Sequence, residues 1–522
     1  MALLTVELGL LAAARSRHDR IGTWAWTGFF LVPLTAALAL RTFIAVSAHD
    51  VLQWDETYYL STAVTGGLGR GLYPFVFGYS PMPILGGLGH LAWLDVMAVK
   101  LAGPNIIALR VVSLAGAAAS IALMYRLVRT LYGHAAGLMG AVITASMYLM
   151  FLTNSARMDA LTFAFVTAGL LAVFRALARD TAGAHYLAGL IFGLALQAHL
   201  DATVTAVACG LPYLFKWRRD CRAAARLRVP TALLLYTAGF ATGLAIFIIC
   251  NVLPDPDAFY RTTAQVRVDA TTWYSSGTTS LAGSFLNPSV LWAKETARYR
   301  LLYKALPFVE IAVFAAAILA AVVRRTSTDR DLLLIAAGAV LGAAILVNNE
   351  SPLYFTHVAP ALCVLLAPLF ARGFSRQAPT EGAGLSGSRS VAFAVFVCAL
   401  GAVNGARPAA AYWSPAPDVS TPDNELAQRV RALASPACTV AGDGRLYVRH
   451  FADYPNFISS GKTEVDYAMM FLKQDNEFQY WKLKQPDVVF GREFSPGLSL
   501  YMGASDLVEA APGIWMAPSC RK

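Results

Sequence analysis

Gln53-Trp54-Asp55-Glu56-Thr57-Tyr58-Tyr59 follows closely on the first long apolar stretch of this sequence, residues 21–46. That stretch is long enough to cross a lipid bilayer as a helix. The residues that precede it include three basic ones, Arg15, Arg17 and Arg20. Because basic residues collect in the cytoplasmic loops of membrane proteins, we expect the adjacent carboxylates of Asp55 and Glu56 on the non-cytoplasmic side.

The composition is that of a polytopic membrane protein. Hydrophobic residues make up 57% of the chain and charged residues 14%, and the mean hydropathy is +0.52. Such a chain is too apolar to be soluble. Residues 1–14 are apolar but have no basic residues ahead of them and no small-residue cleavage site, so we expect them at the cytoplasmic interface rather than in a signal peptide.

The chain has a net charge of +10, and basic residues in the loops account for most of this excess. Basic clusters recur in alternate loops between apolar stretches, which is the pattern of cytoplasmic loops. No basic stretch is interleaved with aromatic residues that could stack on bases, so the sequence argues against a nucleic-acid partner. The clusters lie within residues 126–129, 175–179, 216–228, 324–330 and 372–389.

These markers predict an all-α polytopic domain, residues 1–406, with about eleven transmembrane helices. After the first span, a first outer loop is expected over residues 47–105, with an interfacial helix near residues 83–99. A second large outer loop is expected over residues 254–304. The later spans are predicted near residues 106–126, 135–152, 160–178, 186–198, 202–216, 230–252, 305–324, 331–348, 353–372 and 389–406.

Residues 185–216 are too few for two helices of standard length. A single long helix would place the basic residues 216–228 outside, against the charge rule. The sequence therefore favours two short helices that meet near Gln197-Ala198-His199-Leu200-Asp201, inside the bundle.

Residues 407–522 have a mixed polar and apolar composition and are predicted to form a small extracytoplasmic α/β domain. Thr421-Pro422-Asp423 has the residues of a helix start. Strands are expected at residues 438–441, 487–490 and 514–517, and a second helix at residues 467–484.

Three motifs resemble a known group of enzymes. They are Trp54-Asp55-Glu56-Thr57-Tyr58-Tyr59 with Gly71-Leu72-Tyr73-Pro74 and Tyr79-Ser80-Pro81-Met82-Pro83, then residues 104–129, then Asn154-Ser155-Ala156-Arg157-Met158-Asp159-Ala160. In this order they are similar to the outer loops and intervening helix of GT-C membrane glycosyltransferases, the group of the protein O-mannosyltransferases and the lipid A aminoarabinose transferases. The resemblance covers roughly the first 220 residues, with a similar overall topology beyond.

The resemblance implies transfer of a sugar from a polyprenyl-phosphate donor to an acceptor hydroxyl on the outer face, with inversion at the anomeric carbon. The residues fit this chemistry. A carboxylate at Asp55 can accept the proton of the attacking hydroxyl, and basic side chains can neutralise the departing phosphate. Glu56 is expected either to contact the acceptor or to be a solvated neighbour, and Tyr58 and Tyr59 of the same motif are expected to support the site.

Other candidate residues lie elsewhere in the sequence. Arg157 and Asp159, at the mouth of a span, either pair with one another or have a role in binding phosphate or orienting the loop, because ions at membrane depth are costly and tend to be functional. His199, beside Asp201, is either a functional residue or a packing residue. His357 resembles a position near the donor in the family. Three bases of the second outer loop are expected to attract the lipid phosphate or lipid head groups, namely Arg261, Arg267 and Arg298.

The sequence leaves the sugar and the acceptor open. The aminoarabinose transferases carry an acid followed by lysine where this chain has Ser80-Pro81-Met82. A transferase of the bacterial inner membrane that acts on lipopolysaccharide, cell-wall glycan or protein fits the remaining features. No cofactor is indicated, since two adjacent acids are weak grounds for a divalent metal. The alternatives are a transporter or flippase of a lipid-linked sugar and a nonenzymatic assembly scaffold.

Cysteine positions suggest one disulfide. Of the seven cysteines, only Cys438 and Cys520 fall in the predicted outer tail. An oxidising exterior permits them to pair, and the alternative is two separate buried thiols.

Overall fold

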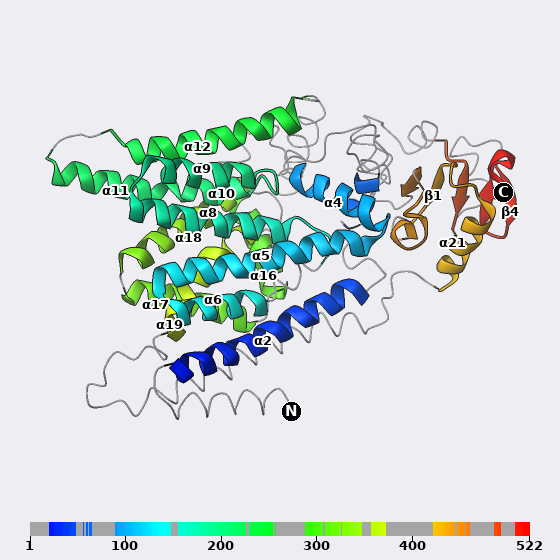
Figure 1. Ribbon diagram of the computed structural model, residues 1–522. Coiled ribbons are helices and arrows are strands. Elements are labelled where there is room, and N and C mark those ends of the chain that lie inside the picture. The colour runs from blue at the N-terminus through cyan, green and yellow to red at the C-terminus, as the bar shows by residue number, and fades with distance from the viewer. Residues whose placement is uncertain are drawn as a thin grey trace.

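The computed structural model describes most of the helical part of the chain and much of the tail. The described residues are 20–47, 56, 59–60, 62–64, 89–147, 155–225, 229–253, 256, 288–305, 308–324, 326–346, 356–371, 421–443, 446–454, 456–459, 485–491 and 507–522. They form a long helical bundle, and a small domain that contains a β-sheet lies at one end of it (Figure 1).

A described helix lies at each predicted span from the first to the one at residues 353–372, with the segment 202–216 divided in two; the span at 389–406 lies outside the described residues. The helix at residues 89–102 overlaps the predicted interfacial helix, whereas the helix at residues 288–305 lies almost wholly in the predicted second outer loop, where no helix was predicted. The helices are α2 (Arg20–Ser47), α4 (Gly89–Ala102), α5 (Ile106–Tyr132), α6 (His134–Ser146), α8 (Asp159–Arg179), α9 (Ala182–Ala195), α10 (Ala202–Ala208), α11 (Gly210–Ala223), α12 (Thr231–Phe247), α16 (Pro288–Ala305), α17 (Phe308–Arg324), α18 (Ser327–Leu346) and α19 (Ala359–Ala371). A π-helical turn, Ile248–Val252, extends α12.

Three of the described helices are long and apolar enough to cross a membrane, namely Ile106–Tyr132, Asp159–Arg179 and Thr231–Val252. Shorter apolar helices occur at Leu34–Val46, Ala136–Ser146, Ala182–Ala195 and Phe314–Val323. In hydrocarbon every backbone amide needs a partner within the chain, and a helix provides one. The protein is therefore a mostly helical membrane protein, while the total of about eleven spans stays a prediction.

The predicted break between two short helices is confirmed. Helix α9 ends at Ala195, a turn covers residues 196–201, and α10 begins at Ala202. The second helix is itself interrupted at Cys209, where α10 gives way to α11. The turn places His199 and Asp201 within the bundle, with side chains only 14% and 9% exposed.

Helices α9 and α12 pack unusually closely (Figure 1). A β-carbon added at Gly189 would lie 1.8 Å from the Tyr236 carbonyl oxygen, and one at Gly239 would lie 2.0 Å from the Tyr186 carbonyl oxygen. Only glycine permits this approach of two backbones, as in the small-residue interfaces of membrane helices. The contact fixes α9, and so the turn that follows it.

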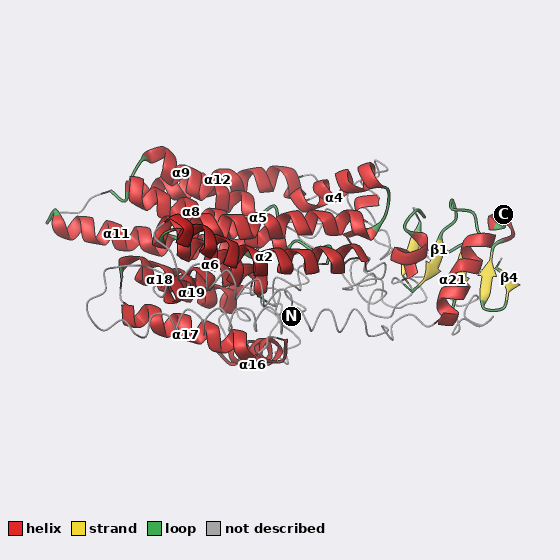
Figure 2. Ribbon diagram, turned by 60° about the horizontal axis from the view of Figure 1, so that its bottom comes forward, coloured by secondary structure: helices red, strands yellow, loops and turns green. Residues whose placement is uncertain are grey.

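The tail contains a five-stranded mixed sheet of order β2-β1-β3-β5-β4. Strand β1 runs parallel to β2 and β3, whereas β5 is antiparallel to β3 and β4. Helix α21 (Thr421–Leu433) begins at the predicted residue and packs against the sheet (Figure 2). The strands are β1 (Val440–Gly442), β2 (Phe457–Ser459), β3 (Val488–Phe490), β4 (Val508–Ala511) and β5 (Ile514–Met516).

Of these strands, β1, β3 and β5 match the predicted positions, and β2 and β4 were not predicted from the sequence. The predicted helix at residues 467–484 lies outside the described residues. The predicted disulfide is confirmed, because Cys438 and Cys520 are bonded across a separation of 82 residues. The bond links the segment that leads into β1 to the last residues of the chain.

Candidate functional site

Glu56 forms a buried ion pair with Arg110, which lies near the start of α5. Arg110 of α5 donates from Nε to Oε1 at 2.8 Å and from Nη2 to Oε2 at 2.7 Å, and both side chains are 0% exposed. The backbone N–H of Ala156 also donates to Oε1, at 2.8 Å, and Arg110 Nη1 donates to the carbonyl oxygen of Ala45 at 3.4 Å. Glu56 therefore joins the first loop to α5 and to the segment before α8, and Arg110 connects the same pair to α2.

Arg157 and Asp159 pair with one another, which was one of the two predicted alternatives. Arg157 Nε donates to Asp159 Oδ2 at 2.7 Å, and both side chains are about 5% exposed or less. The backbone of Arg157 is held in turn by Ser113 of α5, whose hydroxyl donates to the Arg157 carbonyl oxygen at 3.0 Å and lies 3.1 Å from its N–H. Asp159 therefore fixes the guanidinium, and Ser113 fixes the backbone that carries it.

Tyr59 makes a second contact between the first loop and this segment. Its hydroxyl donates to the sulfur of Met158 at 2.7 Å, and the tyrosine is only 5% exposed. Together with the Glu56–Ala156 bond, this contact brings two motifs that are about a hundred residues apart in sequence into one buried cluster.

A second cluster contains the predicted residues His199 and His357. Asp201 Oδ2 lies 3.4 Å from His199 Nδ1 and 3.6 Å from His357 Nε2. The centroids of the two imidazole rings are 5.3 Å apart. Helix α8, which begins at Asp159, packs against α10, which follows the turn of His199 and Asp201, so the two clusters belong to neighbouring elements.

Several predicted residues have no described side chain. Asp55, Tyr58, Arg261 and Arg267 lie outside the described residues, and Arg298 lies in α16 with a side chain that is not described. Their roles, like those of the described candidates, stay predictions.

Two participants were not among the predicted site residues, Arg110 and Asp201. Arg110 is a charge inside a predicted span, and such charges usually have a buried partner or a function. That signal was present in the sequence. Asp201 stands two residues after His199, but only the fold brings the pair to His357, which lies more than 150 residues further along the chain.

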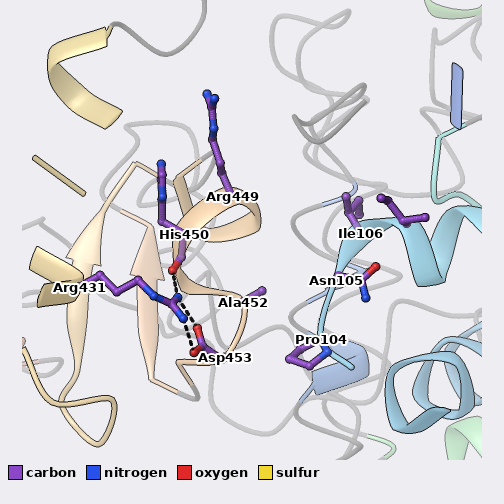
Figure 3. Close-up of a pocket in the computed structure, with 9 residues that line it drawn as sticks. Pro104, Asn105, Ile106, Arg431, Arg449, His450, Ala452 and Asp453 are labelled. Atoms are coloured by element: carbon purple, nitrogen blue, oxygen red, sulfur yellow. Dashed lines mark hydrogen bonds and ion pairs between the residues drawn. The ribbon is translucent and has the colours of Figure 1, made fainter. Parts of the chain in front are cut away.

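A cavity of about 390 Å³ lies between the tail and the first residues of α5 (Figure 3). Pro104, Asn105 and Ile106 line it from the bundle, and Arg449, His450 and Ala452 line it from the tail. On the tail side, Arg431 forms a bidentate ion pair with Asp453, with both N–O distances at 2.7 Å. Both of these side chains are more than 40% exposed, so water screens the pair strongly.

The comparisons with known proteins agree with this architecture. Residues 90–248, less than a third of the chain, match the model of the dolichyl-phosphate-mannose-protein mannosyltransferase family. The structure resembles ArnT from Cupriavidus metallidurans bound to undecaprenyl phosphate, with a TM-score of 0.59 and 14% sequence identity over 94% of this chain and 97% of that chain. No curated protein matches the sequence.

The oligosaccharyltransferase of Archaeoglobus fulgidus also aligns, at 14% identity over 89% of this chain and 69% of that chain, with a TM-score of 0.49. The structure therefore has the GT-C fold, which the resemblance of the sequence motifs also indicated.

Proposed function

We propose that this protein is an inverting glycosyltransferase that moves a sugar from a polyprenyl-phosphate donor to an acceptor hydroxyl at the outer face of the membrane. One observation carries the proposal: buried Glu56 pairs with Arg110 and accepts a hydrogen bond from Ala156 N–H. This arrangement anchors the first loop beside the segment of Arg157 and Asp159. Asp55 is one peptide bond from that anchor.

The roles follow from the chemistry of a single displacement. Asp55 accepts the proton of the attacking hydroxyl, which makes the oxygen a better nucleophile. Arg157, oriented by Asp159, stabilises the negative charge that develops on the phosphate as the bond to the sugar breaks. An attack from the face opposite the departing phosphate inverts the anomeric carbon. Glu56 holds the loop through its ion pair.

The donor class is supported by the structural relative, which was determined with undecaprenyl phosphate bound. Bases of the second outer loop, Arg261, Arg267 and Arg298, are proposed to add attraction for the lipid phosphate. We assign the site and the tail to the extracytoplasmic side of a bacterial inner membrane, since basic residues gather in the alternate loops. The acceptor is a lipopolysaccharide, a cell-wall glycan or a protein.

A transporter or flippase of a lipid-linked sugar is the alternative from another class. It would have comparable basic residues and many helices. Adjacent acids anchored beside an arginine favour the transferase, because a carrier has no proton to remove from an acceptor.

Turnover in detergent separates the two. Purified protein with a labelled polyprenyl-phosphate sugar and a mixture of cell-envelope acceptors should release the lipid phosphate and form a product of inverted configuration. A flippase gives no product there, since a micelle has no two leaflets to move between. Absence of lipid-phosphate release with every acceptor class would contradict the proposal.

The Asp55→Asn variant tests the proposed base. It should lower the rate of transfer by about 10²- to 10⁴-fold, because that is what a general base contributes, with donor binding largely unchanged. Asp180→Asn, which alters an exposed carboxylate after α8, is the matched control and should keep the parental rate. A loss of less than about tenfold in Asp55→Asn would remove Asp55 from this role.

A further inference from the structure

His199, Asp201 and His357 converge from two distant parts of the chain. His199 and Asp201 belong to the turn between α9 and α10, and His357 lies in the turn before α19. One ligand atom from each of the three side chains lies within 4.8 Å of the other two. We propose that these three residues bind one divalent transition-metal ion of the Zn²⁺ class.

The distances fit such an ion. Tetrahedral zinc with bonds of ~2.0–2.1 Å to nitrogen and oxygen separates its ligand atoms by about 3.3 Å. Asp201 Oδ2 lies 3.4 Å from His199 Nδ1 and 3.6 Å from His357 Nε2. Small rotations of the side chains would bring all three donors to one ion. Two imidazoles and a carboxylate also form the ligand set of zinc sites that keep a fourth position open.

The cluster is buried and its backbone is held from both sides. Asp201 and His357 are 8% and 2% exposed. Thr205 of α10 donates from its hydroxyl to the His357 carbonyl oxygen at 2.9 Å, which ties α10 to the turn before α19. Such support outside the ligands themselves is what keeps metal ligands in position.

A hydrogen-bonded histidine–aspartate network without metal is the competing explanation. The Asp201 backbone N–H lies 3.1 Å from His199 Nδ1 and donates to it. That bond shows Nδ1 in its unprotonated form, and because this nitrogen has one lone pair, a metal ion bound there takes the place of the hydrogen bond. An ion pair with Asp201 needs only one imidazole, whereas two converge on the same carboxylate oxygen. The second imidazole favours a metal ion over a simple pair.

The position also suits an anionic substrate. Helix α8, which begins at Asp159, packs against α10, so a bound cation would lie on an element next to the one that follows Arg157, to which we assign the donor phosphate. This consequence rests on the proposed function, whereas metal binding itself does not. A divalent ion with an open position can bind a phosphate oxygen directly.

The test measures the metal alone. The full chain, purified in detergent without a histidine tag and stripped with a chelator, is titrated with Zn²⁺ by calorimetry and with Co²⁺ by visible absorption. We expect one ion per chain, with the absorption of four- or five-coordinate Co²⁺, and displacement of Co²⁺ by one equivalent of Zn²⁺. Failure of the unaltered protein to bind either ion would overturn the proposal without any variant.

Variants assign the ligands. His199→Gln, Asp201→Asn and His357→Gln should each weaken Zn²⁺ binding by more than the ~10- to 100-fold that loss of an outer-shell partner costs. His185→Gln is the matched control, because His185 is a buried histidine of α9 whose Nε2 lies 3.0 Å from the carboxylate of Asp180. It should keep full affinity. Unchanged affinity in the three ligand variants would contradict the assignment. Because no donor or acceptor is present, failure of sugar transfer cannot imitate either result.

Discussion

Among single residues, Glu56 has the largest part in holding the candidate site together. Its two oxygens accept three hydrogen bonds from Arg110 and Ala156, and the ion pair is fully shielded from water. Burying a carboxylate raises the free energy of the folded state because the group loses its hydration. Only the interactions with its partners in the protein compensate for that loss. The sequence favoured contact with the acceptor or with solvent, whereas the structure gives Glu56 partners within the protein.

Breaking this pair should destabilise the protein. Glu56→Ala leaves Arg110 buried without its carboxylate, so we expect a loss of about 3–5 kcal/mol in the free energy of unfolding. Thermal unfolding in detergent would measure it as a lower melting temperature and a lower yield. The double variant Glu56→Met with Arg110→Met removes both charges and should recover much of the loss. Equal stability of Glu56→Ala and the parent would show that the pair contributes little.

Among the helices, the position of α9 depends on the glycines through which it packs against α12. Gly189 and Gly193 face Gly239 and Gly243 of α12, four residues apart in each helix. The hydroxyl of Tyr186 also donates to Thr242 Oγ1 at 3.0 Å across the same interface. Because the turn after α9 carries His199 and Asp201, this contact sets the position of the second cluster as well.

Gly189→Val should separate the two helices. The added β-carbon would overlap the Tyr236 carbonyl oxygen, a backbone atom that cannot rotate away, so we expect at least the ~1–3 kcal/mol of an overpacked core. Gly183→Val in the same helix is the control, since an added β-carbon there meets no atom within 4 Å. Thermal unfolding of the two variants should differ clearly. Similar melting temperatures would argue against close packing of α9 on α12.

The disulfide stabilises the tail at the same scale. Cys438→Ser with Cys520→Ser opens a loop defined by a separation of 82 residues, and the loop-entropy relation gives a loss of roughly 4 kcal/mol. Limited proteolysis of the intact membrane protein should cleave the tail faster in the double variant. Mass analysis of an unreduced digest of the parent should find the two peptides linked. Two free thiols in protein prepared without reductant would contradict the bond.

The two ends of the molecule differ in structure. The tail lies at one end of the bundle, next to the first residues of α5, and α11 with its basic residues extends toward the other end (Figure 1). This separation agrees with the charge pattern of the loops, from which we infer that the tail end is extracytoplasmic.

Thiol labelling tests that orientation. Single cysteines near Gly69 and near Gly277 should react in intact cells with a membrane-impermeant reagent, whereas one near Gly382 should react only after lysis. The background needs Cys221→Ala and Cys250→Ala, because these two thiols are not buried. The reverse pattern would place Asp55 in the cytoplasm, where a nucleotide-sugar donor would be more natural.

Features that depend on neighbouring residues could be predicted from the sequence. Apolar runs and charged loops predicted the membrane class and the positions of most of the helices, though not of α16, and the shortness of residues 185–216 predicted the break before α10. The start of α21 and three strands of the tail followed from local turn and capping residues. These features are local because hydrogen bonding and hydrophobic periodicity act over a few residues.

Contacts between residues that are distant in the sequence could not be predicted in this way. Nothing near Glu56 in sequence indicates Arg110, and nothing near His199 indicates His357. Such pairs depend on how helices pack, and here the packing depends on backbone contacts at single glycines such as Gly189. The composition of a helix determines whether it enters the membrane. The shapes of the packed helix surfaces determine which charges are buried together.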